Sequence, residues 1–253
     1  MMYSFYVERD SFLHRLDPRV KIIGTVVGIA VIMLFNDPTF LVPLFFVTLL
    51  YGRLLGKVEI KEQLRPLKPL LPIVIITIIV WPLIYKPRLM GLLFGLSFAI
   101  RLLTFGLLTF ILLMTTPQRE LILGFVRLGM PYEFGLTISI ALRYIPTLYL
   151  LTRNIMDAQM ARGWEMEKGN FIVRTKRMTV VLIPLLVASL KTAHELSIAL
   201  ESRALGASKK RTFLYDIKMG GKDYAATFVV VLLFALALYV RYVLGLGHVR
   251  IYG

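Results

Sequence analysis

Long apolar runs alternate with short polar segments along most of the chain. The runs cover Val20–Phe35, Phe40–Leu55, Leu70–Tyr85, Leu89–Thr115 and Tyr224–Gly247. A hydrocarbon core of about 30 Å needs roughly 20 helical residues to cross it, so the first three runs need flanking residues to do so. The pattern predicts five transmembrane helices.

Two further helices are predicted between the fourth run and the last. Met130–Arg162 and Met178–Leu205 each place apolar residues three or four positions apart and then continue as polar, charged sequence. At 1.5 Å per residue such helices are about 42–50 Å long, and Pro146 and Pro184 should kink them. We expect two long helices that begin near the bilayer and end as polar tips away from it.

An alternative is that these two helices are additional membrane spans. Arg143 and Arg153 in the first helix oppose that alternative, as do Lys191, His194 and Glu195 in the second. A charged side chain at membrane depth is costly unless it is paired.

The composition favours an integral membrane protein. Residues of the set AVILMFWYC make up 57% of the 253 residues and charged residues 18%, whereas globular chains have about 45–50% apolar and about 25% charged residues. Mean hydropathy is +0.73. A disordered chain, a disulfide scaffold and an ordinary cytosolic enzyme are excluded. We predict an all-α integral membrane protein with about five transmembrane helices plus long cytoplasmic helices.

Side chains suited to catalysis or metal binding are few. The chain has no Cys, so it has neither a thiolate metal site nor a disulfide. Its three histidines, His14, His194 and His248, lie far apart in the sequence, which argues against a His-based metal site. We predict no catalytic residue, no metal site and no cofactor.

The net charge is strongly positive. Lys and Arg number 30 against 15 Asp and Glu, a formal charge of +15. In a soluble protein this balance would suggest a nucleic-acid partner. Here the basic residues fall mainly between the apolar runs, which is typical of cytoplasmic membrane loops. We therefore expect contact with the lipid bilayer and no nucleic-acid partner.

The distribution of Lys and Arg also predicts the orientation. The Asn36–Thr39 turn has no basic residue, whereas the 53–68 loop and the N-terminal segment are both rich in them. This places the N-terminus, the 53–68 loop and residues 117–222 in the cytoplasm of a multi-pass protein of the cell membrane. The predicted division is a four-span block at 1–116, cytoplasmic helices at 117–222, and the last span with a C-terminal tail at 223–253.

Each long predicted helix ends with an arginine between small residues. The motifs are Ala161-Arg162-Gly163 and Ser202-Arg203-Ala204. Small neighbours expose the guanidinium, whose rigid fork of donors suits a carboxylate on a partner. A single arginine near a helix C-terminus often serves only the helix macrodipole. Two such tips on two similar helices indicate a two-point docking device.

The chain resembles a known family through these tips and three further segments. The tips are similar to the paired Ala-Arg-Gly-type motifs of the transmembrane T component (EcfT, CbiQ-like) of energy-coupling factor transporters. The other similar segments are LHRLDPRVKI, the four-span block and RLGMPYEFGLTISIALRYIP. Ala204 stands where glycine is frequent in that family, but alanine is still small.

The resemblance implies a non-enzymatic coupling subunit. In that family the T component couples two ABC-type ATPases to one substrate-binding S component, for uptake of a vitamin or a transition-metal ion. Arg162 and Arg203 would sit in grooves of the two ATPases, and the helices that carry them would be the coupling helices. The residues expected in these contacts are Ala161, Arg162, Gly163, Ser202, Arg203 and Ala204.

Small residues and one charge lie within the apolar runs. Three Gly-x-x-x-Gly pairs, which permit close helix approach, are Gly24/Gly28, Gly52/Gly56 and Gly91/Gly95. They pack helices inside this chain or face the S component. Arg101 lies deep in the fourth run. It is either functional, or it snorkels or bonds to carbonyls at a helix break.

Two alternative functions remain at this point. A membrane-embedded enzyme acting on lipid phosphates would need clustered carboxylates to hold Mg²⁺, and the acids here are scattered. A conventional ABC permease subunit would present one coupling segment per ATPase from each of two copies. The sequence contains no G-x-x-x-x-G-K-[ST] phosphate loop, so any ATP hydrolysis by that route belongs to partners.

Overall fold

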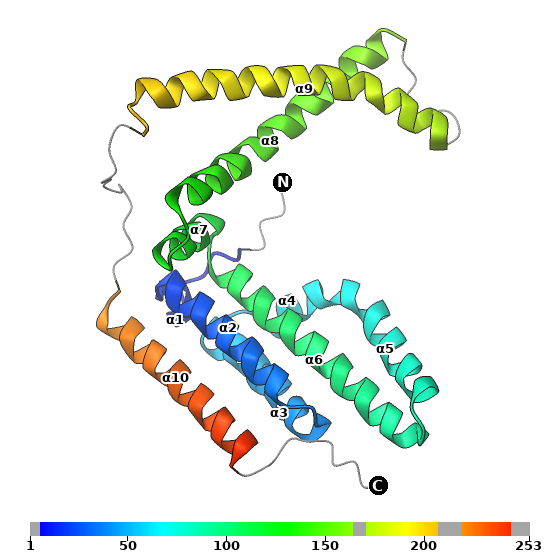
Figure 1. Cartoon of the computed structure of the whole chain (residues 1–253), viewed down its shortest axis with the longest axis vertical. Coiled ribbons are helices and arrows are strands. Elements are labelled where there is room, and N and C mark those ends of the chain that lie inside the picture. Colours follow the sequence, from blue (N-terminus) through cyan, green and yellow to red (C-terminus); the bar gives the residue numbers. More distant parts are fainter. Residues whose placement is uncertain (1–5, 164–170, 207–218, 244–253) are drawn as a thin grey trace. The chain divides into compact units, whose positions relative to one another are not determined.

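The computed structural model describes residues 6–163, 171–206 and 219–243, and for 171–177 the backbone alone. Within these residues the regular structure is helical and contains no strand (Figure 1). The described residues form two compact units, one of residues 6–135 and 219–243 and the other of residues 136–163 and 171–206.

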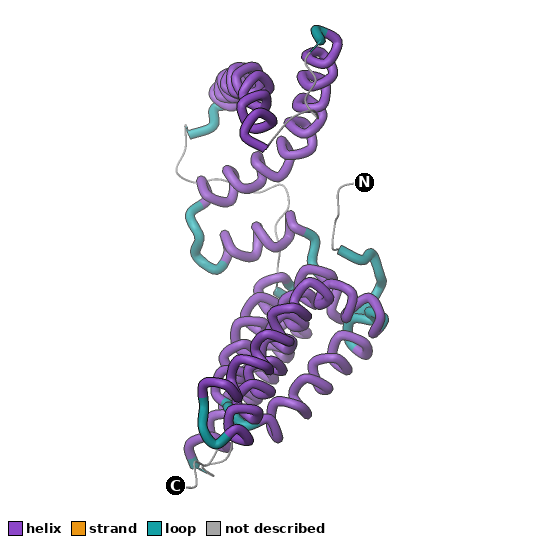
Figure 2. The backbone as a smooth tube through the Cα atoms, turned by 90° about the vertical axis from the view of Figure 1, so that its right-hand side faces the viewer, coloured by secondary structure: helices purple, strands orange, loops and turns teal. Residues whose placement is uncertain are grey.

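The first unit is a bundle of helices that lie side by side (Figure 2). Helix α6 is packed against α5, α3 and α2, while α10 and α7 pack against α2. The helices are α1 (Phe12–Arg15), α2 (Pro18–Leu34), α3 (Pro38–Leu54), α4 (Ile60–Leu64), the 3₁₀ helix η1 (Arg65–Leu70), α5 (Leu71–Ile84), α6 (Arg88–Thr115), α7 (Gln118–Arg127) and α10 (Gly221–Tyr242).

Two of these helices begin with the same dipeptide. Asp17 and Asp37 are the N-caps of α2 and α3, and each carboxylate accepts the backbone N–H two residues later. Each is followed by a proline at the first helical position, where a missing N–H costs nothing. The Asn36-Asp37-Pro38 turn signal therefore separates α2 from α3 as the sequence predicts.

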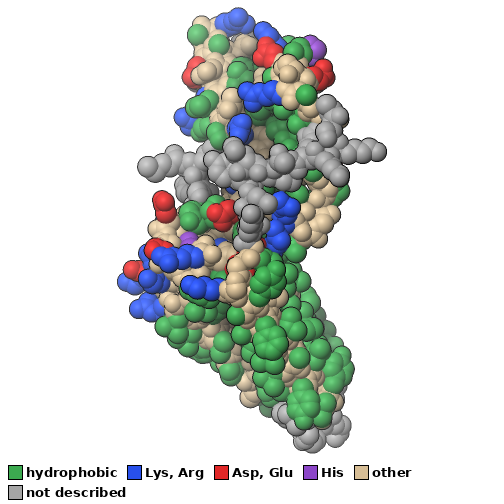
Figure 3. Space-filling view, turned by 90° about the vertical axis from the view of Figure 1, so that its left-hand side faces the viewer, with side chains coloured by type: hydrophobic (Ala, Val, Ile, Leu, Met, Phe, Trp, Pro, Cys, Tyr) green, Lys and Arg blue, Asp and Glu red, His purple; other side chains and the backbone are tan. Residues whose placement is uncertain are grey.

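The interior of the first unit is aliphatic and its outside is apolar as well. Leu107 and Ile111 of α6 form one core cluster with leucines from α1, α3 and η1. Large apolar side chains are also exposed, for example Phe46 at 58%, Ile76 at 59% and Leu232 at 57%. Figure 3 shows this surface on the side where α10 lies. An apolar exterior of this extent suits hydrocarbon rather than water.

The second unit consists of two long helices. α8 (Tyr132–Ala161) has its first four residues in the first unit and the rest in the second. α9 (Phe171–Ser202) contains Pro184 and bends in its first half (Figure 1). Many apolar side chains of both helices are exposed, including Leu150 on α8 and Leu190 on α9. The predicted helix pair is confirmed, although α9 begins seven residues before the predicted Met178.

Every predicted apolar run lies on a helix. The boundaries agree within three residues where they are described; the predicted end of the last run, Gly247, lies outside the described residues. By length and composition, five segments of the described chain could cross a membrane: Ile60–Ile84, Arg88–Thr115, Tyr132–Ala161, Met178–Ser202 and Gly221–Tyr242.

The number of these segments equals the prediction, but the members differ. Helices α2 and α3, with 17 residues each, are not among these segments, while α8 and α9 are included. Length and composition do not separate a membrane span from a long helix at the membrane surface. The placement of α8 and α9 in the cytoplasm therefore stays a prediction, as does the division of the chain at residues 116 and 222.

Candidate functional site

The first predicted tip is a helix end with a left-handed residue. Helix α8 ends at Ala161, and Gly163 follows with φ of 84°. The Gly163 N–H donates to the Met160 carbonyl at 2.9 Å. Glycine adopts this left-handed conformation without the strain that a Cβ causes. Ala161, Arg162 and Gly163 are all exposed.

The second tip has the same backbone geometry. Helix α9 ends at Ser202, and Ala204 has φ of 56°. The Ala204 N–H donates to the Glu201 carbonyl at 2.8 Å, and the Leu205 N–H to the Leu200 carbonyl at 3.0 Å. These two bonds form a Schellman motif, in which the left-handed residue is usually glycine. Sequence reasoning treated Ala204 only as small; the structure adds that it occupies a position where glycine is favoured.

Both arginines therefore occupy one structural position. Arg162 and Arg203 each lie between the last helical residue and the left-handed residue, and both are exposed. A Cβ built on Gly163 would meet no atom within 4 Å, so another surface can approach that backbone. Each guanidinium lies at the negative end of a helix dipole and is available to a carboxylate from outside the unit.

The second tip also borders a groove between the two long helices. The groove has a volume of about 290 Å³ and is lined by Ile140 and Arg143 of α8 and by Leu200 and Arg203 of α9, among others. It brings two arginines, 60 positions apart in sequence, to one cavity. In the sequence, Arg143 is only a charge that opposes a membrane span, and no local motif indicates that it lies near Arg203.

Arg101 is bonded at the turn between two helices. Its Nη2 donates to the Phe35 carbonyl at 2.8 Å and to the Asn36 side-chain oxygen at 2.6 Å. Its guanidinium also lies 5.0 Å from the centre of the Phe98 ring. Since Phe35 caps the C-terminus of α2, these bonds favour the alternative in which Arg101 satisfies carbonyls at a helix break.

Comparisons with known proteins show the family of this chain. The family model described as "Cobalt transport protein" (CbiQ) matches residues 9–212. An "Energy-coupling factor transporter transmembrane protein EcfT" of Acidaminococcus fermentans is 32% identical over 94% of this chain and 95% of its own length. The protein of that name from Heliobacterium modesticaldum is 35% identical, over 89% of this chain and 91% of its own length. The one from Bacillus subtilis is 32% identical, over 95% of this chain and 98% of its own length. The chain belongs to the CbiQ/EcfT family. It is a multi-pass membrane protein and the transmembrane component of an energy-coupling factor transporter.

The paired glycines of this EcfT-family chain face atoms of the same chain. A Cβ on Gly24 would lie 3.7 Å from Val230 of α10, and one on Gly28 would lie 2.7 Å from Leu108 of α6. Gly91 and Gly95 face the backbone of α5, while Gly52 faces the Gln63 side chain and Gly56 lies near Gly52 and Thr115. These contacts favour the packing alternative over contact with an S component.

Sequence reasoning missed a set of polar contacts at one end of the first unit. The Asp223 carboxylate is buried and accepts the N–H of Asp17 at 2.8 Å and that of Gly220 at 2.8 Å. It thereby joins the start of α10 to the start of α2. Lys21, also buried, donates from Nζ to the Thr115 carbonyl at the end of α6 at 3.1 Å. An acid in the first turn before an apolar run signals a helix start, but it does not reveal a partner 206 positions away.

The left-handed conformation of Ala204 leads to a prediction about the stability of the end of α9. Replacing Ala204 with glycine should stabilise the end of α9 by about 1 kcal/mol, because glycine avoids the Cβ clash of this conformation. Hydrogen exchange of the amides of Ala204 and Leu205 should slow about fivefold. Gly163→Ala, the matched change at the first tip, should act in the opposite direction. Unchanged exchange in both variants would contradict the left-handed geometry.

Proposed function

We propose that this chain couples two ABC-type ATPases to a substrate-binding S component, for uptake of a vitamin or a transition-metal ion. The observation that carries the proposal is the pair of exposed arginines, Arg162 and Arg203, in one backbone geometry at the ends of two long helices. The names of the relatives support an energy-coupling factor complex, and the description of the family model as a cobalt transport protein supports a metal ion as one substrate class.

Each tip docks on one ATPase in this proposal. The guanidinium of Arg162 or Arg203 donates two parallel hydrogen bonds to a carboxylate in a groove of the ATPase. The small neighbours Ala161, Gly163, Ser202 and Ala204 let the wall of that groove approach the backbone. In this proposal the tips dock and perform no chemical step.

The long helices then transmit the motion. Helices α8 and α9 have 30 and 32 residues, about 45 and 48 Å at 1.5 Å per residue. When the ATPases close on ATP, the docked tips move, and the groove shared by Arg143 and Arg203 lets one helix shift against the other. We place the S component against the exposed apolar side chains of these helices, where the shift would reorient it for substrate release.

Docking to ATPases requires one orientation of the chain in the membrane. The tips must lie in the cytoplasm, where ATP is available, and with them the N-terminus and the 53–68 loop. This orientation agrees with the excess of Lys and Arg in those segments, and the membrane is the cell membrane.

Counting the subunits tests the proposal. Affinity purification of the tagged chain in mild detergent should yield two ATPase subunits and one small membrane protein for each copy of this chain, measured by the mass of the intact complex. Two copies of this chain for each ATPase pair would instead support a conventional ABC permease. Recovery of the chain without ATPases, with metal-dependent turnover of a lipid substrate, would support the enzyme alternative.

A further inference from the structure

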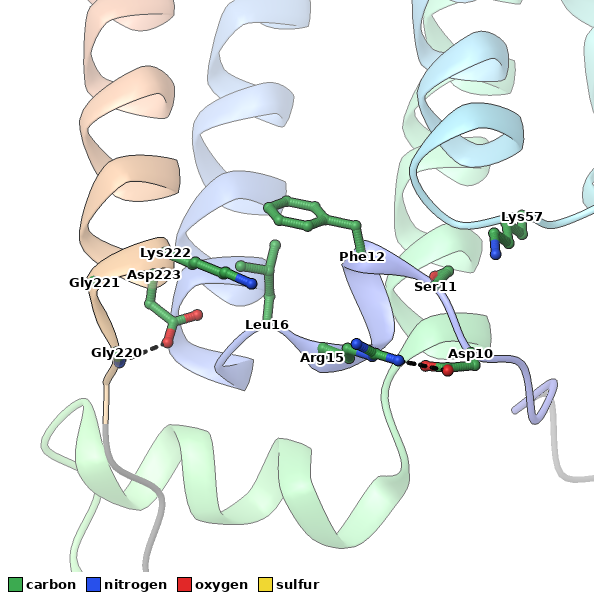
Figure 4. Close-up of a pocket in the computed structure, with 10 residues that line it drawn as sticks. All are labelled: Asp10, Ser11, Phe12, Arg15, Leu16, Lys57, Gly220, Gly221, Lys222 and Asp223. Carbon is green, nitrogen blue, oxygen red and sulfur yellow. Dashed lines mark hydrogen bonds and ion pairs between the residues drawn. The ribbon is translucent and has the colours of Figure 1, made fainter.

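A basic cavity lies at one end of the first unit. Its volume is about 600 Å³, and it is bordered by the N-terminal segment around α1, by Lys57 and by the start of α10. Figure 4 shows Lys222 reaching from the start of α10 toward Leu16, with Phe12 on the neighbouring edge. Neither the tips nor the long helices contribute to this cavity.

Three cations from three segments line the cavity, and one of them, Arg15, forms an ion pair. Arg15 donates to both oxygens of Asp10, at 2.7 and 2.6 Å, and this bond lowers the pKa of Asp10. Within the described part of the chain, the ion pairs involve neither Lys57 nor Lys222. Both lysines are exposed, so an anion can reach them, although Lys57 also attracts the Asp10 carboxylate.

The other carboxylate of the cavity, that of Asp223, is hydrogen-bonded to the backbone. Asp223 accepts two backbone N–H groups, from Asp17 and Gly220. Its bond to Gly220 caps the amino end of α10, so the helix dipole contributes little to an incoming anion. The attraction of the cavity for anions therefore depends on the lysines.

The cavity lies where polar surface gives way to apolar surface. Phe12, on its edge, is 47% exposed, and Tyr224 and Phe228 of α10, one and two turns further along, are 65% and 68% exposed. In Figure 3 the apolar surface of the first unit ends at a band of basic and acidic side chains. Aromatic residues beside basic residues are typical of the level at which lipid headgroups lie.

We propose that this cavity binds the headgroup of an anionic phospholipid, whose phosphate is attracted by Lys57 and Lys222 from opposite sides of the cavity (Figure 4). Arg15 contributes a weaker attraction because Asp10 shares its charge. A soluble phosphate offers the same oxygens, but the apolar edge with Phe12 and the exposed aromatic residues of α10 provide a surface for the acyl chains that only a lipid carries. The bound lipid would hold the start of α10 beside α1. This site is independent of the proposed docking of ATPases.

Lipid binding to the purified full-length chain tests the site. Native mass spectrometry in detergent would measure binding of phosphatidylglycerol, with phosphatidylcholine as the zwitterionic comparison. We expect phosphatidylglycerol to bind about tenfold more tightly, and Lys57→Gln with Lys222→Gln to weaken its binding about 25-fold, since each lysine near a membrane surface contributes about fivefold. Lys61→Gln with Lys86→Gln removes the same charge away from the cavity and should change binding less than about twofold.

Several outcomes would overturn the proposal. Equal binding of the two lipids would do so, as would equal loss in the cavity variant and the control. Displacement of the lipid by millimolar inorganic phosphate would show a site for soluble anions instead. If the double variant does not fold, Lys222→Gln alone, at an exposed position in the first turn of α10, should weaken binding about fivefold; unchanged binding would again contradict the site.

Discussion

Replacing both Arg162 and Arg203 with glutamate should abolish co-purification of the ATPases with this chain. Each substitution replaces a donor fork with a carboxylate that faces the proposed carboxylate of the ATPase. Breaking a charge pair at an interface costs about 2–5 kcal/mol, and like charges in contact add to that cost. Each single variant should retain part of the ATPase, because one tip still docks. Quantified recovery of ATPase from a mild-detergent purification measures the effect.

A matched control separates docking from a general effect of charge. Arg153→Glu with Lys191→Glu makes the same change in net charge at exposed positions within α8 and α9. Arg153 lies 4.9 Å from the centre of the Tyr149 ring, a weak contact at an exposed site. This control should keep the ATPases bound. Normal recovery with the tip variant, or equal loss in both, would refute docking through the tips.

The conservative variants test the role of the guanidinium fork. Arg162→Lys with Arg203→Lys keeps both charges but loses the paired donors. Recovery of ATPase should be weaker than in the wild-type chain and stronger than in the glutamate variant. Full recovery would mean that charge alone suffices.

Helices were predictable here because the sequence marks their ends. The Asp-Pro dipeptides at 17–18 and 37–38 supply both an N-cap and a first-turn proline, and the structure begins α2 and α3 there. The start of α9 was placed too late, at Met178. The seven residues before it are FIVRTKR, in which a cluster of polar residues interrupts the apolar pattern on which the predicted start rested.

The partners of single residues were less predictable than the helices. The tips were found because Arg162 and Arg203 stand in short local motifs. The left-handed conformation of Ala204 depends on how the backbone of α9 ends, and the bond between Asp17 and Asp223 joins residues 206 positions apart. Arg101 shows the same limit, since its charge was visible in the sequence but the Phe35 carbonyl that it contacts was not.

A large loss of stability is expected from a substitution at Gly91 of α6, which belongs to one of the glycine pairs. A Cβ at this position would lie 2.6 Å from the Pro82 Cα and 2.7 Å from the Trp81 carbonyl oxygen of α5. Both atoms belong to the backbone and cannot rotate away. Gly91→Ala should therefore push α5 and α6 apart and destabilise the protein by about 1–3 kcal/mol. The ring of Trp81 stacks on Phe98 of α6, with centres 4.8 Å apart, so the displacement would also loosen that contact.

Gly24→Ala is the matched control, because it makes the same substitution in another of the glycine pairs. Its Cβ would meet nothing closer than Val230 at 3.7 Å, an ordinary contact, and alanine favours a helix over glycine by about 0.5–1 kcal/mol. Thermal unfolding in detergent should therefore show a midpoint that falls by several degrees for Gly91→Ala and stays or rises for Gly24→Ala. A Gly91→Ala midpoint at or above that of the wild-type chain would mean that α5 and α6 do not pack at this distance. A fall in both variants would mean that α10 approaches Gly24 more closely than 3.7 Å.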